Sequence, residues 1–238
     1  MLYGVISDIH GNYDALSVAL KFLENKKVDA IINCGDIVGY GPDPNKCIEA
    51  VRKQKNLYSV MGNHDWAVIN NEDSKWFNPI AKKAIEWSRE TILSRNYDYL
   101  SEFVTTKSIG NFMFLHGSPR NPLNEYLLDI SEVLPNFMVM FHKICFIGHT
   151  HTPACYKCNI DNKVEKVHLK DGEQILLEPG SRYIFNVGSV GQPRDEDSRM
   201  SVCIYNNNDI SVSYRRLEYN IPKVQEKINA AQLDTPSL

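Results

Sequence analysis

Short apolar runs alternate with segments of helical periodicity through the first third of the chain. Three runs are aliphatic and β-branched, as buried strands are: Leu2–Ser7, Ala30–Cys34 and Leu57–Met61. After the turn-forming pair Gly11-Asn12, the helical repeat of Leu16, Leu20 and Leu23 predicts one helix, and Asn45–Lys53 is a second. Strands that alternate with helices predict right-handed crossovers and a largely parallel sheet.

The remaining two thirds are richer in short strands. A helical pattern extends from Asn78 to about Leu100, and residues 221–238 form a predicted helical tail. Polar turns separate the further predicted strands, which are Phe112–Leu115, Ile144–Ile147, Val164–His168, Gln174–Leu177, Arg182–Val187, Met200–Tyr205 and Asp209–Leu217. No repeat, low-complexity segment or linker interrupts the chain, so we predict one domain over residues 1–238.

Composition and charge narrow the class of protein. The chain has 238 residues, of which 43% are hydrophobic, enough for a substantial core. A net charge of -3 and the absence of a basic patch argue against nucleic-acid binding. No apolar run reaches the length of a membrane span, and the N-terminus lacks the features of a signal peptide, so we expect a cytoplasmic protein. We interpret Cys155-Tyr-Lys-Cys158 as chance spacing in a strand or hairpin, since structural zinc needs four ligands.

Side chains that bind metals follow the apolar runs. The segments are Asp8-Ile-His10, Gly35-Asp36, Gly62-Asn63-His64-Asp65, His116 and Gly148-His149-Thr-His151, and they hold five of the seven histidines. Carboxylate oxygens and imidazole nitrogens suit hard and borderline divalent ions. Open α/β sheets place ligands at the carboxyl ends of their strands, where these segments are predicted to lie.

The spacing within the segments suggests how their side chains coordinate an ion. If the chain is still near-extended at Asp8 and His10, residues two apart point to the same side, and His149 and His151 repeat that spacing. Asp36 has two carboxylate oxygens and can bridge two ions. A single Asp after a strand is usually a cap or turn residue, a single Asn is usually a turn former, and a single His is usually a hydrogen-bonded residue at or near the surface. Five such segments in this order are nevertheless improbable by chance.

At these five segments the chain resembles the calcineurin-like metallophosphoesterase superfamily, whose pattern is D-x-H, G-D, G-N-H-[DE], a single H and G-H-x-H. The resemblance implies an α/β fold of four αββα layers, with two mixed sheets flanked by helices. It implies two metal ions, drawn from Mn, Fe, Zn, Co or Ni. One ion would be held by Asp8, His10, Asp36 and His151. The other would be held by Asp36, Asn63, His116 and His149, with Asp36 shared and His64 reaching toward the substrate.

Such a site implies phosphoester hydrolysis by metal-bound hydroxide. Two cations roughly 3.5–4 Å apart can bind a shared hydroxide and clamp the phosphoryl oxygens. His64 is the expected general acid for the leaving group, and Asp36 the expected bridging ligand. Arg120 and Arg194 are candidates to neutralise the phosphate, with Arg120 favoured because it follows His116 closely. Tyr40 is a candidate to stack a base, and Asp65 a supporting residue.

Departures from the superfamily pattern bear on the substrate. Tyr40 replaces the arginine typical of protein phosphatases and of the symmetrical diadenosine tetraphosphatases related to them. Gly39 replaces the aspartate that orients the catalytic histidine in protein phosphatases, which leaves the residue that orients His64 open. The chain is more similar to a small prokaryotic-type subgroup related to diadenosine tetraphosphatases. We therefore expect small phosphoester substrates, such as dinucleoside polyphosphates or nucleotide phosphodiesters. The alternatives are a nuclease, or a non-catalytic scaffold of the same fold, which predicts lost ligands.

Overall fold

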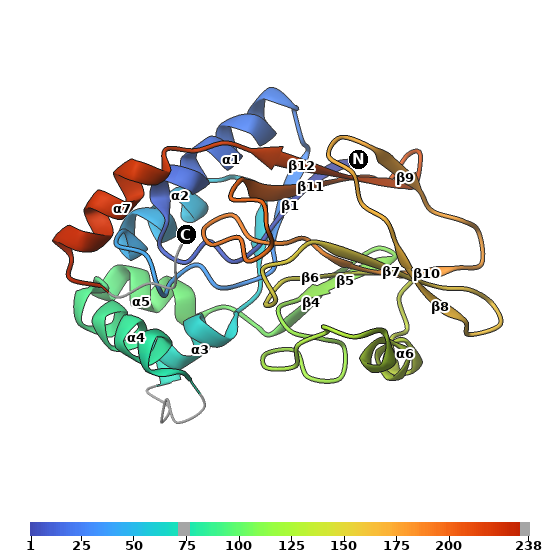
Figure 1. Cartoon of the computed structure of the whole chain (residues 1–238), viewed down its shortest axis with the longest axis horizontal. Helices are drawn as coiled ribbons and strands as arrows, with labels where there is room; N and C mark the ends of the chain where they lie inside the picture. The colour runs from blue at the N-terminus through green and yellow to red at the C-terminus, as the bar shows by residue number, and fades with distance from the viewer. Residues whose placement is uncertain (71–76, 234–238) are drawn as a thin grey trace.

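Two six-stranded mixed sheets lie face to face in the computed structural model, which describes residues 1–70 and 77–233 (Figure 1). Sheet A has the strand order β3-β2-β1-β11-β12-β9, and sheet B has the order β4-β5-β6-β10-β7-β8. The strands of sheet A are β1 (Leu2–Ile6), β2 (Ala30–Asn33), β3 (Leu57–Ser59), β9 (Gln174–Leu176), β11 (Met200–Asn206) and β12 (Ser211–Leu217). Those of sheet B are β4 (Thr106–Ile109), β5 (Phe112–Leu115), β6 (Ile144–Ile147), β7 (Ala154–Cys158), β8 (Val164–Val167) and β10 (Arg182–Asn186).

Helices cover the outer faces of both sheets. They are α1 (Tyr13–Asn25), α2 (Pro44–Arg52), α3 (Asn63–Asn70), α4 (Pro79–Thr91), α5 (Ser94–Ser101), α6 (Ile130–Val139) and α7 (Ile221–Ala230). Leu16 and Ile48, from α1 and α2, pack with Ile6 on the outer face of sheet A. On the other side, Phe137 of α6 packs with Ile147 of sheet B. The predicted αββα sandwich is confirmed.

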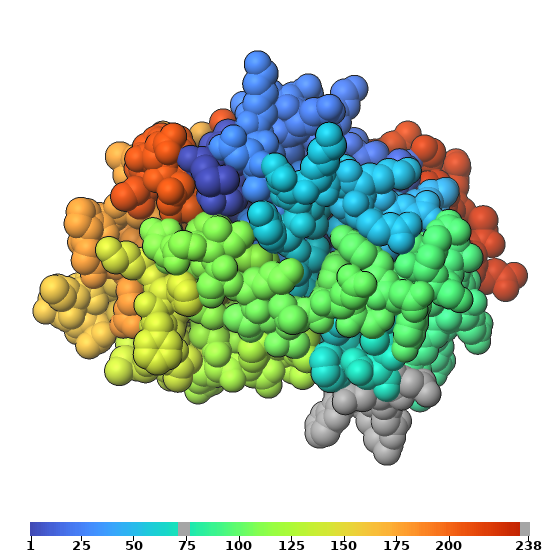
Figure 2. All heavy atoms as spheres, turned by 180° about the vertical axis from the view of Figure 1, so that it is seen from behind, coloured from blue at the N-terminus to red at the C-terminus, as the bar shows by residue number. Residues whose placement is uncertain are grey.

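An aromatic core joins the two sheets. Tyr3 and Tyr205 of sheet A meet Phe112 and Phe146 of sheet B, with ring centroids 5.1–5.6 Å apart across the interface. Seen from behind, the segments nearest the N-terminus (blue) lie above the middle segments of the chain (green) (Figure 2). This packing fixes the edges of the two sheets relative to each other.

Parallel pairing brings particular strand ends together. Strands β1, β2 and β3 run parallel in sheet A, and β5, β6 and β10 run parallel in sheet B. The predicted crossovers in the first third are therefore present, with α1 and α2 as the connecting helices. The carboxyl ends of these six strands carry the loops in which the motif residues lie.

Several element predictions need correction. The helical pattern over 78–100 is two helices, because Ile92 and Leu93 are extended and end α4 before α5 begins. The strand β4 and the helices α3 and α6 were missed. The segment Thr106–Ile109 is partly exposed and weakly patterned. Helix α6 begins with a capping box of Asp129 and Glu132, which is the usual sequence signal for a helix start.

The C-terminal tail is helical in part. Helix α7 spans Ile221–Ala230, and residues 234–238 of the predicted tail lie outside the described residues. Lys227 contacts the carboxylates of Asp14 in α1 and Asp43 before α2, which fixes α7 to the same layer. The assignment of residues 1–238 to one domain stays a prediction. Among the described helices, none has the length and apolar character needed to cross a membrane.

Candidate metal centre

The predicted ligands lie at neighbouring strand ends of both sheets. Asp8, Asp36 and Asn63 follow β1, β2 and β3 of sheet A. His116 and His149 follow β5 and β6 of sheet B. All five are buried, as are the nearby His10 and His151. Three overlapping groups of these side chains and His64 place ligand atoms within 4.8 Å of one another. The structure therefore brings together the set that the motifs predicted.

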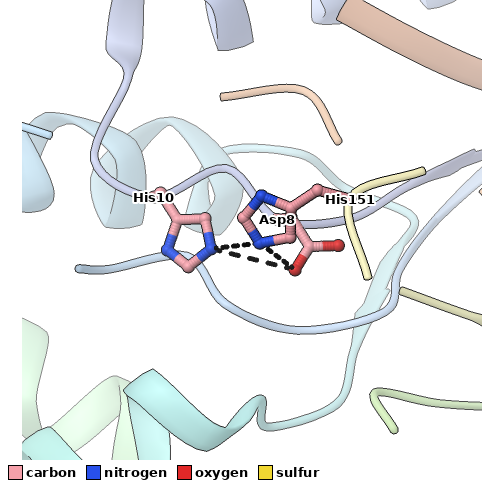
Figure 3. Close-up of side chains that lie close together, drawn as sticks. All are labelled: Asp8, His10 and His151. Carbon is pink, nitrogen blue, oxygen red and sulfur yellow. Dashed lines mark hydrogen bonds and ion pairs between the residues drawn. The ribbon is translucent and has the colours of Figure 1, made fainter. Parts of the chain in front are cut away.

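The first group is Asp8, His10 and His151 (Figure 3). The Nδ1 atoms of His10 and His151 lie 3.1 and 2.6 Å from the carbonyl oxygens of Val38 and Gln192. A carbonyl oxygen only accepts, so each Nδ1 carries the proton of a neutral ring and each Nε2 carries a lone pair. These two Nε2 atoms nevertheless lie 3.0 Å apart.

Two facing lone pairs repel each other unless a cation lies near both. The carboxylate of Asp8 adds a further acceptor, with Oδ1 3.3 Å from His151 Nε2 and 3.8 Å from His10 Nε2. Asp8, His10 and His151 thus direct three acceptor atoms toward a common point. A divalent cation fits it better than any hydrogen-bond pattern does.

The second group is organised around His116. Its Nδ1 lies 2.9 Å from the carbonyl oxygen of Cys34, so in the neutral ring Nδ1 carries the proton and Nε2 is the atom free to bind a metal. That Nε2 is 3.0 Å from Asn63 Oδ1 and 3.2 Å from Asp36 Oδ2. His149 completes the group, with Nδ1 3.1 Å from His116 Nε2. Here too, oxygen and nitrogen acceptors converge, as a metal site requires.

Asp36 lies between the two groups. Its Oδ2 is 3.2 Å from His116 Nε2 and 3.6 Å from His10 Nε2, while Oδ1 accepts the backbone N–H of His64 at 2.9 Å. A Cβ atom at Gly62 would lie 2.0 Å from Asp36 Oδ1, so only glycine allows this approach. The position of Asp36 supports the predicted bridging role, which stays a prediction.

Charges in the centre are unevenly distributed. Burial opposes ionisation of Asp36, but the neighbouring His116 and His64 hold its pKa well below the usual range. Burial lowers the pKa of His10 well below its usual value and that of His149 to about 3. Burial acts against protonation of His116 as well, yet the Asp36 carboxylate raises its pKa to about 9. The centre thus offers ionised carboxylates and mostly neutral imidazoles, a donor set suited to cations.

The backbone of the ligands differs from the prediction. Five predicted ligands, Asp8, His10, Asp36, His149 and His151, have positive φ angles between 46° and 71°. The near-extended geometry predicted for Asp8-Ile-His10 is therefore wrong. The N–H groups of Asp8 and His10 bond to the carbonyls of Gly35 and Asp36, which bends the chain into a turn. Asp and His are among the few residues that tolerate this left-handed conformation.

His64 is enclosed by rings. Its imidazole centroid lies 4.9 Å from that of Tyr40, 4.8 Å from that of His10 and 5.1 Å from that of Phe77. A Cβ at Gly39 would come within 2.6 Å of His64 Nδ1, so no side chain fits at that position. Burial lowers the pKa of His64 to about 4. Aromatic packing, not a carboxylate, therefore positions this ring, and Phe77 was missed because it belongs to no motif.

Asp65 lies behind the ligands. Its carboxylate accepts the backbone N–H groups of Ile37, Val38 and Gly62 at 2.9–3.1 Å. Burial, reinforced by the charge of Asp36, raises its pKa to about 7. Asp65 ties the start of α3 to the loop after β2, which fits the predicted supporting role better than contact with a substrate.

The two candidate arginines have different surroundings. The Arg194 guanidinium lies 5.5 Å from the Tyr40 ring centroid and donates to Gln192 Oε1 at 2.8 Å. Arg120 is instead paired with the carboxylate of Glu125, which also accepts from Asn136. Arg194 therefore lies beside His64 and its aromatic enclosure, whereas the charge of Arg120 is countered locally.

Tyr126 is a further residue that the sequence analysis missed. Its ring stacks on His149 with centroids 3.7 Å apart and planes at 24°. It is exposed on its outer side, so it lies at the mouth of the centre. No motif or periodicity marks this residue, because it lies in an irregular segment ten positions after His116.

Comparison with known proteins agrees with this geometry. Residues 1–209 match the family described as calcineurin-like phosphoesterase superfamily domain. The chain is 35% identical to an uncharacterised protein of Methanocaldococcus jannaschii over 95% of this chain and 91% of that protein. It is 38% identical to a metallophosphoesterase of known structure from Sphaerobacter thermophilus, with a TM-score of 0.86 over 98% of this chain and 95% of that one.

A shorter match involves an enzyme of named activity. Over 67 residues, 27% of this chain and 25% of the relative, it is 39% identical to a symmetrical bis(5'-nucleosyl)-tetraphosphatase of Wigglesworthia glossinidia brevipalpis. The family match, the similar structure and the clustered Asp and His ligands lead to one conclusion. The chain belongs to the calcineurin-like phosphoesterase superfamily of metal-dependent phosphoester hydrolases.

Proposed function

We propose that this protein is a dinuclear-metal phosphoesterase that hydrolyses small phosphoesters, with dinucleoside polyphosphates and nucleotide phosphodiesters as its substrate classes. The observation that carries the proposal is the position of Asp36 Oδ2, which lies within 3.6 Å of a histidine Nε2 atom in each ligand group. The short similarity to a symmetrical bis(5'-nucleosyl)-tetraphosphatase supports the nucleotide part of the proposal. The complete ligand set counts against a non-catalytic scaffold.

The residues divide between two ions as the motifs suggested. Asp8, His10, Asp36 and His151 would hold one ion, and Asp36, Asn63, His116 and His149 the other. The imidazole-rich set favours Mn, Fe, Zn, Co or Ni over Mg or Ca. When bound, such ions polarise phosphoryl oxygens and lower the pKa of water at the site.

The other residues would orient the substrate. His64 faces the Asp36 side of the centre. Its lowered pKa makes it a neutral hydrogen-bond donor in the free protein, and the negative charge of a bound phosphate would raise that pKa and let it donate a proton to the leaving oxygen. Tyr40 packs against both His64 and Arg194 and would fix the position of one side chain relative to the other. Arg194 would contact a phosphate oxygen, and Arg120 is a second candidate that must first be released by Glu125.

Metal titration tests the proposal. Metal-free protein should show no hydrolysis of an aryl phosphodiester and should gain it as Mn, Fe, Zn, Co or Ni is added. Thermal unfolding should shift upward in the same titration, since an ion at 100 times its Kd adds about 2.7 kcal/mol to the free energy of unfolding. Thermal stabilisation without hydrolysis of any substrate would indicate the scaffold instead.

A substrate panel with the active metal separates the substrate classes. It should contain dinucleoside polyphosphates, cyclic nucleotides, aryl phosphates and single-stranded DNA. We expect little cleavage of DNA, because a net charge of -3 gives no general attraction for a polyanion. Preferential cleavage of DNA would favour the nuclease.

The two arginines can be compared directly. Arg194→Ala should lower kcat/KM by about 10-fold or more, since one charge-assisted contact contributes about 1.5–3 kcal/mol. The loss should increase with the number of phosphates in the substrate. Arg120→Ala should cost less, because Glu125 already engages its guanidinium. A larger loss for Arg120→Ala, with Arg194→Ala unchanged, would reverse this assignment.

A further inference from the structure

Helix α6 carries two apolar stripes, and only one of them is covered. Val133, Phe137 and Met140 are buried against sheet B. Ile130, Leu134 and Met138 recur four residues apart and form a second stripe that is exposed. A helix of a monomer normally presents polar residues on the side away from its core. Figure 1 shows α6 below sheet B and away from the other helices, so no neighbouring helix covers this stripe.

The exposed surface is large for a monomer. Phe141 follows the helix and is 99% exposed, and Met138 is 64% exposed. The side chains that share this exposure are Leu128, Ile130, Leu134, Met138, Val139 and Phe141. Together they expose on the order of 600 Å² on and beside α6, which approaches the ~800 Å² that each partner buries in a standard interface.

We propose that a second copy of this chain covers the stripe, with the two α6 helices packed antiparallel about a two-fold axis. The apolar area approaches what one half of a stable dimer needs. A two-fold interface joins one patch to itself, so the stripe must be self-complementary. In an antiparallel pair Leu134 lies at the axis and meets its own copy, and Ile130 meets Met138 of the second copy.

Charge at the ends of α6 favours the same arrangement. Asp129 and Glu132 lie at the start of the helix, and Lys143 follows its end. All three are exposed or partly exposed. Antiparallel pairing places the acidic end of one copy against the basic end of the other, whereas parallel pairing would oppose like charges. The helix dipoles are also opposed in this pairing, which is favourable.

Sedimentation of the full chain tests the interface. Wild type should sediment as a dimer, and Met138→Lys and Phe141→Lys should shift it to monomer at the same concentration. Leu176→Lys is the matched control, since Leu176 is 66% exposed but lies on β9 of the other sheet. Unchanged thermal unfolding of the variants would show that they fold. A monomeric wild type at the highest soluble concentration, or a dimer that survives both α6 substitutions, would overturn the proposal.

Cross-linking tests the two-fold geometry. The six native cysteines are buried and unpaired, so an added surface thiol is distinguishable. Under mild oxidation Leu134→Cys should form a disulfide-linked dimer, because the axis brings the two thiols together. Leu176→Cys should remain monomeric on a non-reducing gel. Failure of Leu134→Cys to cross-link, while Leu176→Cys does, would place the contact on sheet A and reject pairing through α6.

Discussion

Replacing Asp36 by asparagine is expected to remove at least one of two bound ions and to lower the hydrolytic rate by about 10³-fold or more, since metal stabilisation of phosphoryl transfer amounts to several kcal/mol. The asparagine keeps the oxygen that accepts the His64 backbone N–H. It replaces the other oxygen by an NH₂ group, which faces the Nε2 atoms of His116 and His10. The bridging negative charge is lost, while the shape of the site is kept.

The same substitution has a second effect on the metal-free protein. The ionised Asp36 carboxylate lies 3.2 Å from His116 Nε2 and raises the pKa of that imidazole, so metal-free Asp36→Asn, which loses this charge pair, should unfold at a lower temperature than metal-free wild type. Elemental analysis, steady-state rates and thermal unfolding with and without metal measure these effects. Asp161→Asn removes the same charge from the exposed turn before β8 and serves as control. Two full equivalents of metal together with a wild-type rate would exclude the bridging role.

His64→Asn is expected to keep both ions and lose rate. General acid catalysis contributes about 10²–10⁴-fold, so the loss should be in this range for substrates with poor leaving groups. Activated aryl esters need little protonation and should lose much less. The ring contributes no backbone interaction that asparagine lacks, because its contacts are with Tyr40, His10 and Phe77.

Rates across a series of leaving groups separate these outcomes. A steeper dependence on leaving-group pKa in His64→Asn than in wild type supports proton donation. His168→Asn is the matched control, since His168 lies outside every motif. An equal loss for good and poor leaving groups would mean that His64 only binds the phosphate, and loss of metal would make it a ligand.

The sequence predicted the fold class and the Asp, Asn and His side chains that the structure brings together at the strand ends. Apolar runs followed by Asp8, Asp36 and His116 mark strand ends, and the parallel order of those strands follows from the alternating helices. Helix α3 was missed because Gly62 and Asn63 resemble a turn. Helix α6 was missed although Asp129 and Glu132 form a capping box at its start, which could have revealed it.

Contacts between segments far apart in the chain could not be predicted from the sequence. Tyr126 stacks on His149 and Phe77 packs on His64 only after both sheets have closed. The partner of Arg120 could not be foreseen either, since nothing marks Glu125 as its neighbour across a loop. Local backbone conformation was predicted wrongly at Asp8 and His10 for a similar reason. Their left-handed turn is imposed by hydrogen bonds to the loop after β2.

The left-handed backbone conformation of the predicted ligands costs stability at the metal centre. Of the nine non-glycine residues with positive φ in the described chain, five are predicted ligands. Each costs roughly 1–2 kcal/mol relative to a glycine in the same conformation. Glycine at His10 or His151 would relax that strain, but it would also remove a ligand and leave a cavity where a buried ring had been. Lys27 and Gln232 have the same left-handed conformation and are exposed, so glycine at these two positions should raise the stability of the fold and leave the hydrolytic rate unchanged.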